Sequence, residues 1–189
     1  MQAIIRASSV VEQDMQQIIE FWRDAGYEKW FNGGAGFDAA CRERFLDAHF
    51  AAARREHDDW MDSADGALAL LILRDQIPRN VFRGSGHAFA TDPLALHYAG
   101  RAVEAGFDRQ VEPALRAFVY MPFEHSEAPA DQRRAVELFT TLGNAESLKY
   151  AHAHLDVIEK FGRFPHRNRA LGRVNTPEEQ AWLDAGGGF

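Results

Sequence analysis

Hydrophobic residues recur every three or four positions along most of the chain, a spacing that places them on one face of a helix. Near the N-terminus, the residues with this spacing are Val11, Met15, Ile18 and Trp22. Ser9 and Glu12 have the spacing of a capping box, in which each side chain binds a free backbone N–H at the start of a helix. The pattern predicts a first helix that begins at Ser9 and stops at Gly26.

The rest of the chain shows the same patterning, broken by short polar stretches. The further predicted helices are 38–59, 64–77, 93–106, 112–121, 129–142, 145–161 and 177–185. The run 67–73 is apolar on all sides, which predicts a buried helix. The glycine-rich stretch 29–37 is expected to be a loop, and GGGF at 186–189 is expected to fray. No segment alternates as a strand does, so the predicted fold is all-α, with residues 1–189 in a single domain.

Three prolines suggest how the helices are arranged. Pro78, Pro122 and Pro165 are 44 and 43 residues apart, and each follows a predicted helix. A period of this length is typical of stacked two-helix hairpins. If each proline marks a turn, all three turns lie at the same end of the stack. The polar segments DQIPRN (75–80), MPFEHSE (121–127) and FGRFPHRN (161–168) would then form one edge.

The first polar turn contains Asp75, Arg79 and Asn80. These side chains are suited to hydrogen-bond the exposed carbonyls at a helix end, which need partners whatever the function. Alternatively, Arg79 presents its guanidinium group to an anionic ligand.

The second turn places Glu124, His125, Ser126 and Glu127 in a row. A histidine between carboxylates is suited to acid–base work near neutral pH, so His125, Glu124 and Glu127 are candidate catalytic residues. His125 and Glu127 offer only two metal ligands, and no other pair has a recognised spacing, so we expect no metal and no cofactor. Nothing around Ser126 marks it as a nucleophile.

The third turn holds Arg163, His166, Arg167 and Asn168, within a basic run at 160–173 that has no acidic residue. If the three turns meet, the arginines either form salt bridges with the acids of the other two turns or hold a bound anion. The charges alone do not decide between these two alternatives.

Two further histidines lie on the predicted helix 145–161. His152 and His154 are two positions apart, so they point in nearly opposite directions and cannot share a metal. We expect His152 to pair with Asp156 at the surface.

The overall composition narrows the possible partners. The chain has 189 residues and a formal net charge of −7, which argues against nucleic acid as a partner. Its single cysteine, Cys41, indicates a reducing compartment. The longest apolar run, 66–73, is too short to cross a bilayer, and the N-terminus does not resemble a secretion signal. We therefore expect a cytoplasmic protein with no membrane partner.

Several ordered motifs together resemble the bacterial domain-of-unknown-function 924 family. They are FW (21–22), DQIPRN, FRG (82–84), AFATDPLAL (88–96), YMPFEHSE (120–127), DQ (131–132), FGRFPHRN and LGR (171–173). The resemblance covers nearly the whole chain. It implies stacked antiparallel helical hairpins in a tetratricopeptide-like right-handed superhelix, and it implies no reaction.

Two classes of function follow from these observations. Stacked hairpins favour a module that binds a protein, a peptide or a small ligand in a groove with apolar and polar walls. Alternatively, the protein is a small-molecule enzyme or an anion-binding protein. In that case Arg79, Arg163 and Arg167 would clamp the ligand, and His125 and His166 would form an acid–base pair. The sequence contains no complete catalytic constellation. RNA binding through 160–173 has only the local basic run in its favour.

Overall fold

The structure is a computed structural model that describes residues 2–189, with side chains from Asp14 onward. All regular structure within these residues is helical and none is strand, which confirms the all-α prediction. The α-helices are α1 (Gln2–Asn32), α2 (Gly34–Ala53), α3 (Ala64–Leu71), α4 (Ile77–Val81), α5 (Asp92–Glu104), α6 (Ala117–Glu124), α7 (Pro129–Leu142), α8 (Ala145–Phe161) and α9 (Pro177–Asp184). Between them lie a π-helix (Ile72–Gln76) and short 3₁₀ segments at Asp58–Asp62, Gly86–Phe89, Phe107–Arg109 and Pro165–Arg167.

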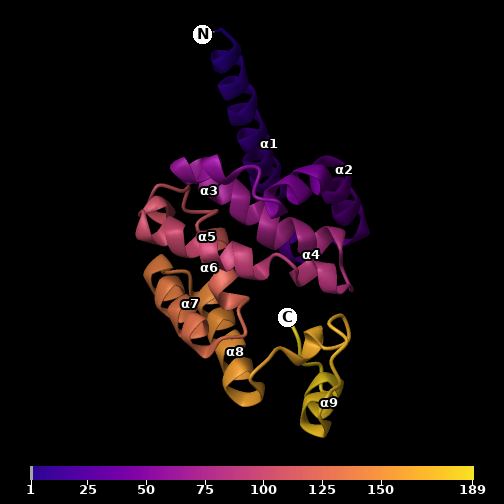
Figure 1. Ribbon diagram of the computed structural model, residues 1–189. Coiled ribbons are helices and arrows are strands. Elements are labelled where there is room, and N and C mark those ends of the chain that lie inside the picture. The colour runs from indigo at the N-terminus through magenta and orange to yellow at the C-terminus, as the bar shows by residue number, and fades with distance from the viewer. Residues whose placement is uncertain (1) are drawn as a thin grey trace.

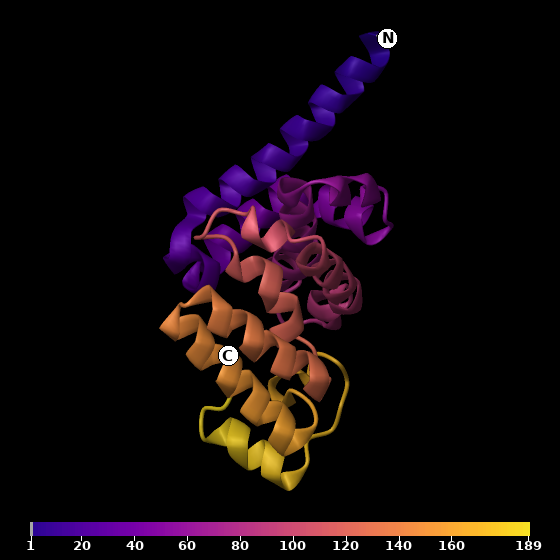
Figure 2. The same ribbon diagram turned by 90° about the vertical axis from the view of Figure 1, so that its left-hand side faces the viewer.

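Most helices pack against neighbours that are close in chain order. Helix α3 contacts α1 and α5, α5 contacts α6, α6 contacts α7, and α7 contacts α8. Figures 1 and 2 show this succession, with the N-terminal part of α1 extending away from the other helices and α9 at the opposite end. The order fits stacked hairpins, while the tetratricopeptide-like superhelix stays a prediction.

The core forms around α3, where the sequence predicts a helix buried on all sides. Every residue from Leu68 to Leu73 is at most 1% exposed. Aromatic residues extend the core towards α1, where Trp22 packs edge-on against Phe118 of α6 with ring centroids 5.5 Å apart. The next residue after the apolar run, Arg74, is also fully buried. Its guanidinium group lies 4.0 Å from the centroid of the Tyr98 ring and donates to the carbonyl of Ala52.

The first helix differs from the prediction at its start, whereas the stop predicted at Gly26 coincides with a break in the helix. Helix α1 begins at Gln2, so the start predicted at Ser9 is wrong; the side chains of Ser9 and Glu12 lie outside the described residues. The backbone leaves the helical conformation at Gly26 (φ 69°, ψ 173°), but the helix resumes and continues to Asn32. The predicted loop at 29–37 is therefore almost entirely helical. In this stretch Phe37 is buried, and the half-buried Trp30 donates from its indole to the carbonyl of Trp22.

Two of the three prolines do not mark turns. Pro78 lies in the first turn of α4, where its missing N–H is not needed, and Pro122 lies inside α6. The helices end three and two residues later, at Val81 and Glu124. Only Pro165 follows a helix as predicted, after Gly162 has ended α8 in the left-handed conformation (φ 69°).

Candidate functional site: a buried polar cluster

The three polar segments contact one another, as the sequence predicts. The Asp75 Oδ1 and His125 Nδ1 atoms are 2.7 Å apart. Arg167 Nη1 donates to the carbonyl oxygen of His125 at 3.0 Å. The backbone N–H of Phe164 donates to Glu127 Oε1 at 2.8 Å. Three segments that are distant in the sequence thus form one polar edge, and several of their residues belong to a buried polar cluster. We define this cluster as Asp75, Arg79, Asp92, Glu124, His125, His154, His166 and Arg167.

Two arginines and two aspartates form the charged centre of the cluster. Arg79 donates to both carboxylate oxygens of Asp92 at 2.9 Å, and its Nη1 lies 3.1 Å from Asp75 Oδ1. Arg167 Nη1 reaches Asp92 Oδ2 at 3.2 Å. Its guanidinium group lies over the rings of Phe89 and Phe164, at 4.6 and 4.4 Å from their centroids. The formal charges of these four polar side chains sum to zero, so the charged centre offers no net charge to a ligand.

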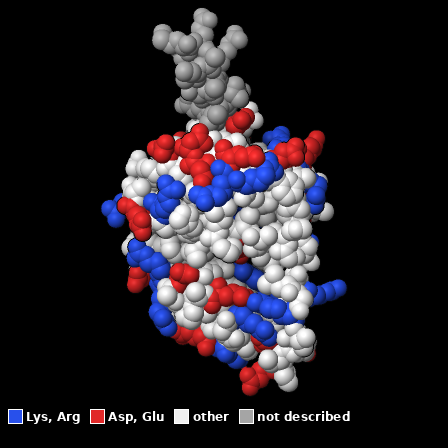
Figure 3. Space-filling view, in the orientation of Figure 1, with Lys and Arg blue, Asp and Glu red and all other residues white. Residues whose placement is uncertain are grey.

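Two further arginines of the basic run, Arg163 and Arg173, are also paired. Arg163 binds both carboxylate oxygens of Glu179 at 2.6 and 2.7 Å, and Arg173 binds both of Glu127 at 2.7 and 2.9 Å. Asn168 binds Asn175 and Arg173 rather than the cluster. Figure 3 shows blue and red side chains mixed over the face in view. Arg173 thus pairs with an acid of the second predicted turn, as the salt-bridge alternative expects, whereas Arg163 pairs with Glu179 of α9 and lies outside the cluster.

The segment predicted to be the first turn, residues 75–80, is helical, and its polar side chains bind backbone carbonyls as the sequence suggests. Asn80 donates to the carbonyl of Gln76 at 3.0 Å, and Arg79 Nη1 donates to the carbonyl of Asp75 at 2.6 Å. Asn80 thus donates to a carbonyl at a helix end, whereas Arg79 donates to such a carbonyl and also pairs with the acids of the cluster.

Asp75 and His125 form an oriented pair. Burial alone would raise the pKa of the Asp75 carboxyl, but Arg79 and His125 outweigh it and hold the pKa well below its usual range. Burial, reinforced by Arg79, lowers the pKa of His125, which favours a neutral imidazole near pH 7. An ionised carboxylate can only accept a hydrogen bond, so Nδ1 of this imidazole carries the proton and Nε2 is left with a free lone pair.

The pKa of Glu124 is shifted in the opposite direction to that of Asp75. Burial of its carboxyl, followed by the nearby charge of Asp75, raises the pKa to about 8, so this side chain is protonated at pH 7. Its Oε1 atom is buried and has no hydrogen-bond partner among the described residues. His154 Nδ1 lies 3.4 Å away, but it hydrogen-bonds the carbonyl of Tyr150 at 2.9 Å instead. The cluster therefore contains a neutral carboxylic acid whose hydrogen-bonding capacity is unused.

The remaining two histidines of the cluster are neutral as well. Burial, followed by the influence of His125, lowers the pKa of His154 to about 3. Burial, followed by the influence of Arg167, lowers the pKa of His166 to about 4. The Nδ1 atom of His166 is buried and has no partner within the described part of the chain.

The sequence does not identify Asp92 and His154 as members of the cluster, and it does not predict the contact between Phe189 and His154. Asp92 stands before a proline at a helix start, where an acid is common, so nothing singled it out. His154 does have a signal, since Ala151, His154 and Ile158 recur at helical spacing and all are buried. Phe189 lies in the segment expected to fray, and its ring stacks on the His154 imidazole with centroids 3.7 Å apart.

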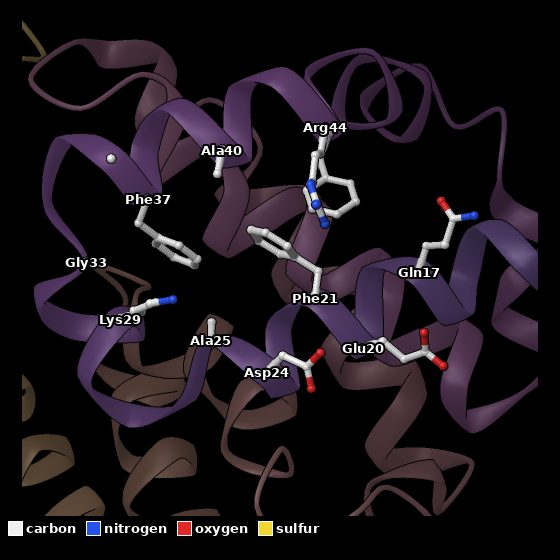
Figure 4. A pocket seen from close by; sticks show the side chains of 12 residues that line it. Gln17, Glu20, Phe21, Asp24, Ala25, Lys29, Gly33, Phe37, Ala40 and Arg44 are labelled. Carbon is white, nitrogen blue, oxygen red and sulfur yellow. The ribbon is translucent and has the colours of Figure 1, made fainter.

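A separate cavity of about 890 Å³ lies between α1 and α2. Phe21 and Phe37 face one another across it with nearly parallel rings, 5.5 Å between centroids, as Figure 4 shows. Charged side chains of both signs stand around these rings: Glu20, Asp24, Lys29 and Arg44. This cavity has the mixed apolar and polar lining that the binding-module hypothesis expects, but no residue of the three predicted turns lines it.

Residues 18–187 match the family described as "Bacterial protein of unknown function (DUF924)". The chain belongs to this family. A solved structure of a protein of unknown function from Agrobacterium tumefaciens is 49% identical to this chain and has a TM-score of 0.88. The match covers 90% of this chain and 97% of that one. A comparison with curated proteins gives no match. In residues 2–189, no helix has the length and apolar character needed to cross a membrane.

Proposed function

We propose that this protein is a small-molecule enzyme that performs general acid–base chemistry at the buried polar cluster. His125 is the general base and Glu124 is the general acid. The observation that carries the proposal is the 2.7 Å contact between the buried Asp75 carboxylate and His125 Nδ1. This contact fixes the imidazole and directs its basic lone pair to Nε2, the arrangement that general bases use in unrelated enzymes.

The neighbouring acid completes a pair with opposite roles. A carboxyl group whose pKa is raised to about 8 keeps its proton at pH 7 and can supply it to a substrate. His125 removes one proton while Glu124 supplies another. The net reaction is then an isomerisation, an elimination or an addition of water. Ser126 takes no part as a nucleophile in this scheme, because its hydroxyl donates to Asp131 at 2.7 Å.

A purely structural role explains only part of the cluster. Arg79, Asp92 and Arg167 join three segments of the chain, as a salt-bridge staple would. Glu124 adds nothing to such a staple, because a protonated carboxyl with an unpartnered buried oxygen destabilises the fold. Costly groups of this kind gather at functional sites.

The charge balance also indicates the substrate class. Arg79 and Arg167 are already neutralised by Asp75 and Asp92, so they have little charge left for an anion. This pairing favours an uncharged substrate over the anionic ligand that the basic run suggests.

The test is a panel of uncharged substrates that require proton transfer, including epoxides, lactones and β-hydroxy ketones. We expect turnover of at least one of them by the wild type and a loss of about 100-fold or more in His125→Ala. The matched control is His152→Ala, because His152 is exposed on α8. Equal turnover of every substrate by wild type and His125→Ala would contradict the proposal.

A second candidate function rests on the cavity between α1 and α2. Its stacked phenylalanines and mixed charges suit a peptide with an aromatic or aliphatic anchor between charged residues. Phe21→Ala should abolish capture of such peptides from a random library, whereas Phe50→Ala, at an exposed position of α2, should leave it intact. A library that enriches no sequence on the wild type over Phe21→Ala would refute this candidate.

A further inference from the structure

The segment Gly186–Phe189 returns to the buried polar cluster after α9 has ended. In Figure 1 the trace turns back from α9 towards the other helices before it reaches the point marked C. The Phe189 ring lies parallel to the His154 imidazole, with 3.7 Å between centroids and 12° between planes. A side chain at the end of a glycine run thus covers one face of a cluster histidine.

Two more rings surround the same position. His166 meets the Phe189 ring edge-on, at 5.7 Å and 85°, and Phe164 does so at 6.3 Å and 89°. One stacked ring and two perpendicular rings are the arrangement that aromatic groups prefer around a planar guest. We call His154, Phe164 and His166 the ring seat.

Phe189 is held only weakly in the ring seat. Its side chain is 52% exposed, whereas Phe164 beneath it is fully buried. The three residues before it, at positions 186–188, are all glycine, so they add no side-chain contacts and lose much conformational freedom when ordered. The ring therefore leaves the seat at little cost, and an incoming ring can replace it.

The ring seat also borders polar atoms that a phenyl group cannot satisfy. Glu124 Oε1 lies 3.4 Å from His154 Nδ1, and both Glu124 Oε1 and His166 Nδ1 are buried without a partner in the described residues. Glu124 is 5% exposed, so its free oxygen is well inside the protein. A guest with hydrogen-bonding groups beside its ring would satisfy atoms that Phe189 leaves unpaired.

We infer that the ring seat is a binding subsite for an uncharged aromatic or heteroaromatic ring that carries an amide or hydroxyl group, and that Phe189 occupies it as an internal competitor. The inference deepens the proposed function, since the ring would belong to the substrate, but binding at the seat can be measured without catalysis. Because the tail and the guest compete, the apparent affinity falls by the fraction of molecules in which the seat is free. If Phe189 fills the seat in about nine molecules of ten, its removal should tighten binding about tenfold.

The probe is benzamide, and its saturated analogue cyclohexanecarboxamide is the ligand control. Binding is followed by the NMR signals of the histidine rings in the wild type, Phe189→Ala and Phe31→Ala. Phe31 is the matched protein control, because it is also a phenylalanine with 52% exposure and lies on α1. We expect benzamide to shift the His154 signals and to bind Phe189→Ala about tenfold more tightly than the wild type or Phe31→Ala.

Other outcomes overturn the inference. These are no binding of benzamide to Phe189→Ala, equal affinity for all three proteins, equal affinity for the saturated amide, or shifts that spare His154. Thermal melting of Phe189→Ala establishes that the variant is folded. His125→Ala separates the two proposals: if it binds benzamide normally and turns over the substrate panel as the wild type does, the ring seat stands and the acid–base mechanism fails.

Discussion

Replacing Glu124 by glutamine tests whether this buried side chain is a neutral acid. Glutamine keeps the size and neutrality of a protonated glutamate, but it cannot ionise. The folded pKa of Glu124 is raised to about 8, whereas the ordinary value is 4.5. Stabilisation by the protonated form is fully present below pH 4.5 and is lost as the pH rises through 8, because the unfolded chain releases this proton first. Glu124→Gln has no proton to release at this position, so its stability does not fall in this way as the pH rises.

The size of the effect follows from the two pKa values. Each pH unit between them changes the free energy of unfolding by about 1.4 kcal/mol. At pH 7 the wild type therefore carries a penalty of about 3 kcal/mol that Glu124→Gln does not share. The advantage of the variant should grow by about 2–3 kcal/mol between pH 5 and pH 7. The cluster histidines make the free energy of unfolding rise with pH, which is opposite to the effect of Glu124. Both proteins contain these histidines, so their contribution cancels in the difference.

The assay is urea unfolding at pH 5, 6 and 7, followed by far-ultraviolet circular dichroism. Glu178→Gln, at an exposed position of α9, is the control and should change the free energy of unfolding by less than about 0.5 kcal/mol. A variant that is less stable than the wild type at pH 7, or a difference that does not grow with pH, would show that Glu124 is ionised in the folded protein and would refute the reasoning.

Two further predictions concern stability. Asp92→Ala removes the shared partner of Arg79 and Arg167, and it should lower the free energy of unfolding by about 3–5 kcal/mol in urea titrations. Asp38→Ala, which breaks the exposed Asp38–Arg83 pair, should cost about 1 kcal/mol or less; equal losses would mean that the cluster's ion pairs carry no special weight. Gly66→Ala should lower the melting temperature, because the new Cβ would stand 2.1 Å from the carbonyl oxygen of Trp60. Gly36→Ala in α2 meets no atom within 4 Å and should raise the melting temperature slightly, so a reversed order would contradict the close approach of Gly66 to Trp60.

The fold follows from the sequence wherever local signals agree with packing. Glycine at 162 and the capping box at Thr176 and Glu179 mark their helix ends correctly, because both motifs satisfy backbone groups within a few residues. The prolines at 78 and 122 mislead, since a proline near a helix end is tolerated once burial of the surrounding apolar residues holds the helix. Burial of this kind depends on distant residues and is not visible in a local pattern.

The location of the candidate site can be predicted from the sequence, but which acid pairs with which base within it cannot. The three polar segments meet as predicted, yet the acid shared by Arg79 and Arg167 is Asp92, which belongs to none of the three segments. The carboxylate that orients His125 comes from Asp75 of the first segment. Which acid meets which base depends on distances of a few ångströms between helices, and helical spacing does not determine these distances. Phe189 shows the same limit, because its contact with His154 joins residues that no periodicity relates.

The protonation state of His125 tests the proposed mechanism most directly. In ¹⁵N NMR spectra of the histidine rings at pH 7, we predict a neutral imidazole with its proton on Nδ1 and a pKa below the ordinary value, as burial and Arg79 dictate. Asp75→Asn should remove the preference for this tautomer, while the spectrum of His152 stays unchanged. An imidazolium at pH 7, ion-paired with Asp75, would contradict the account and leave the cluster a salt-bridge staple.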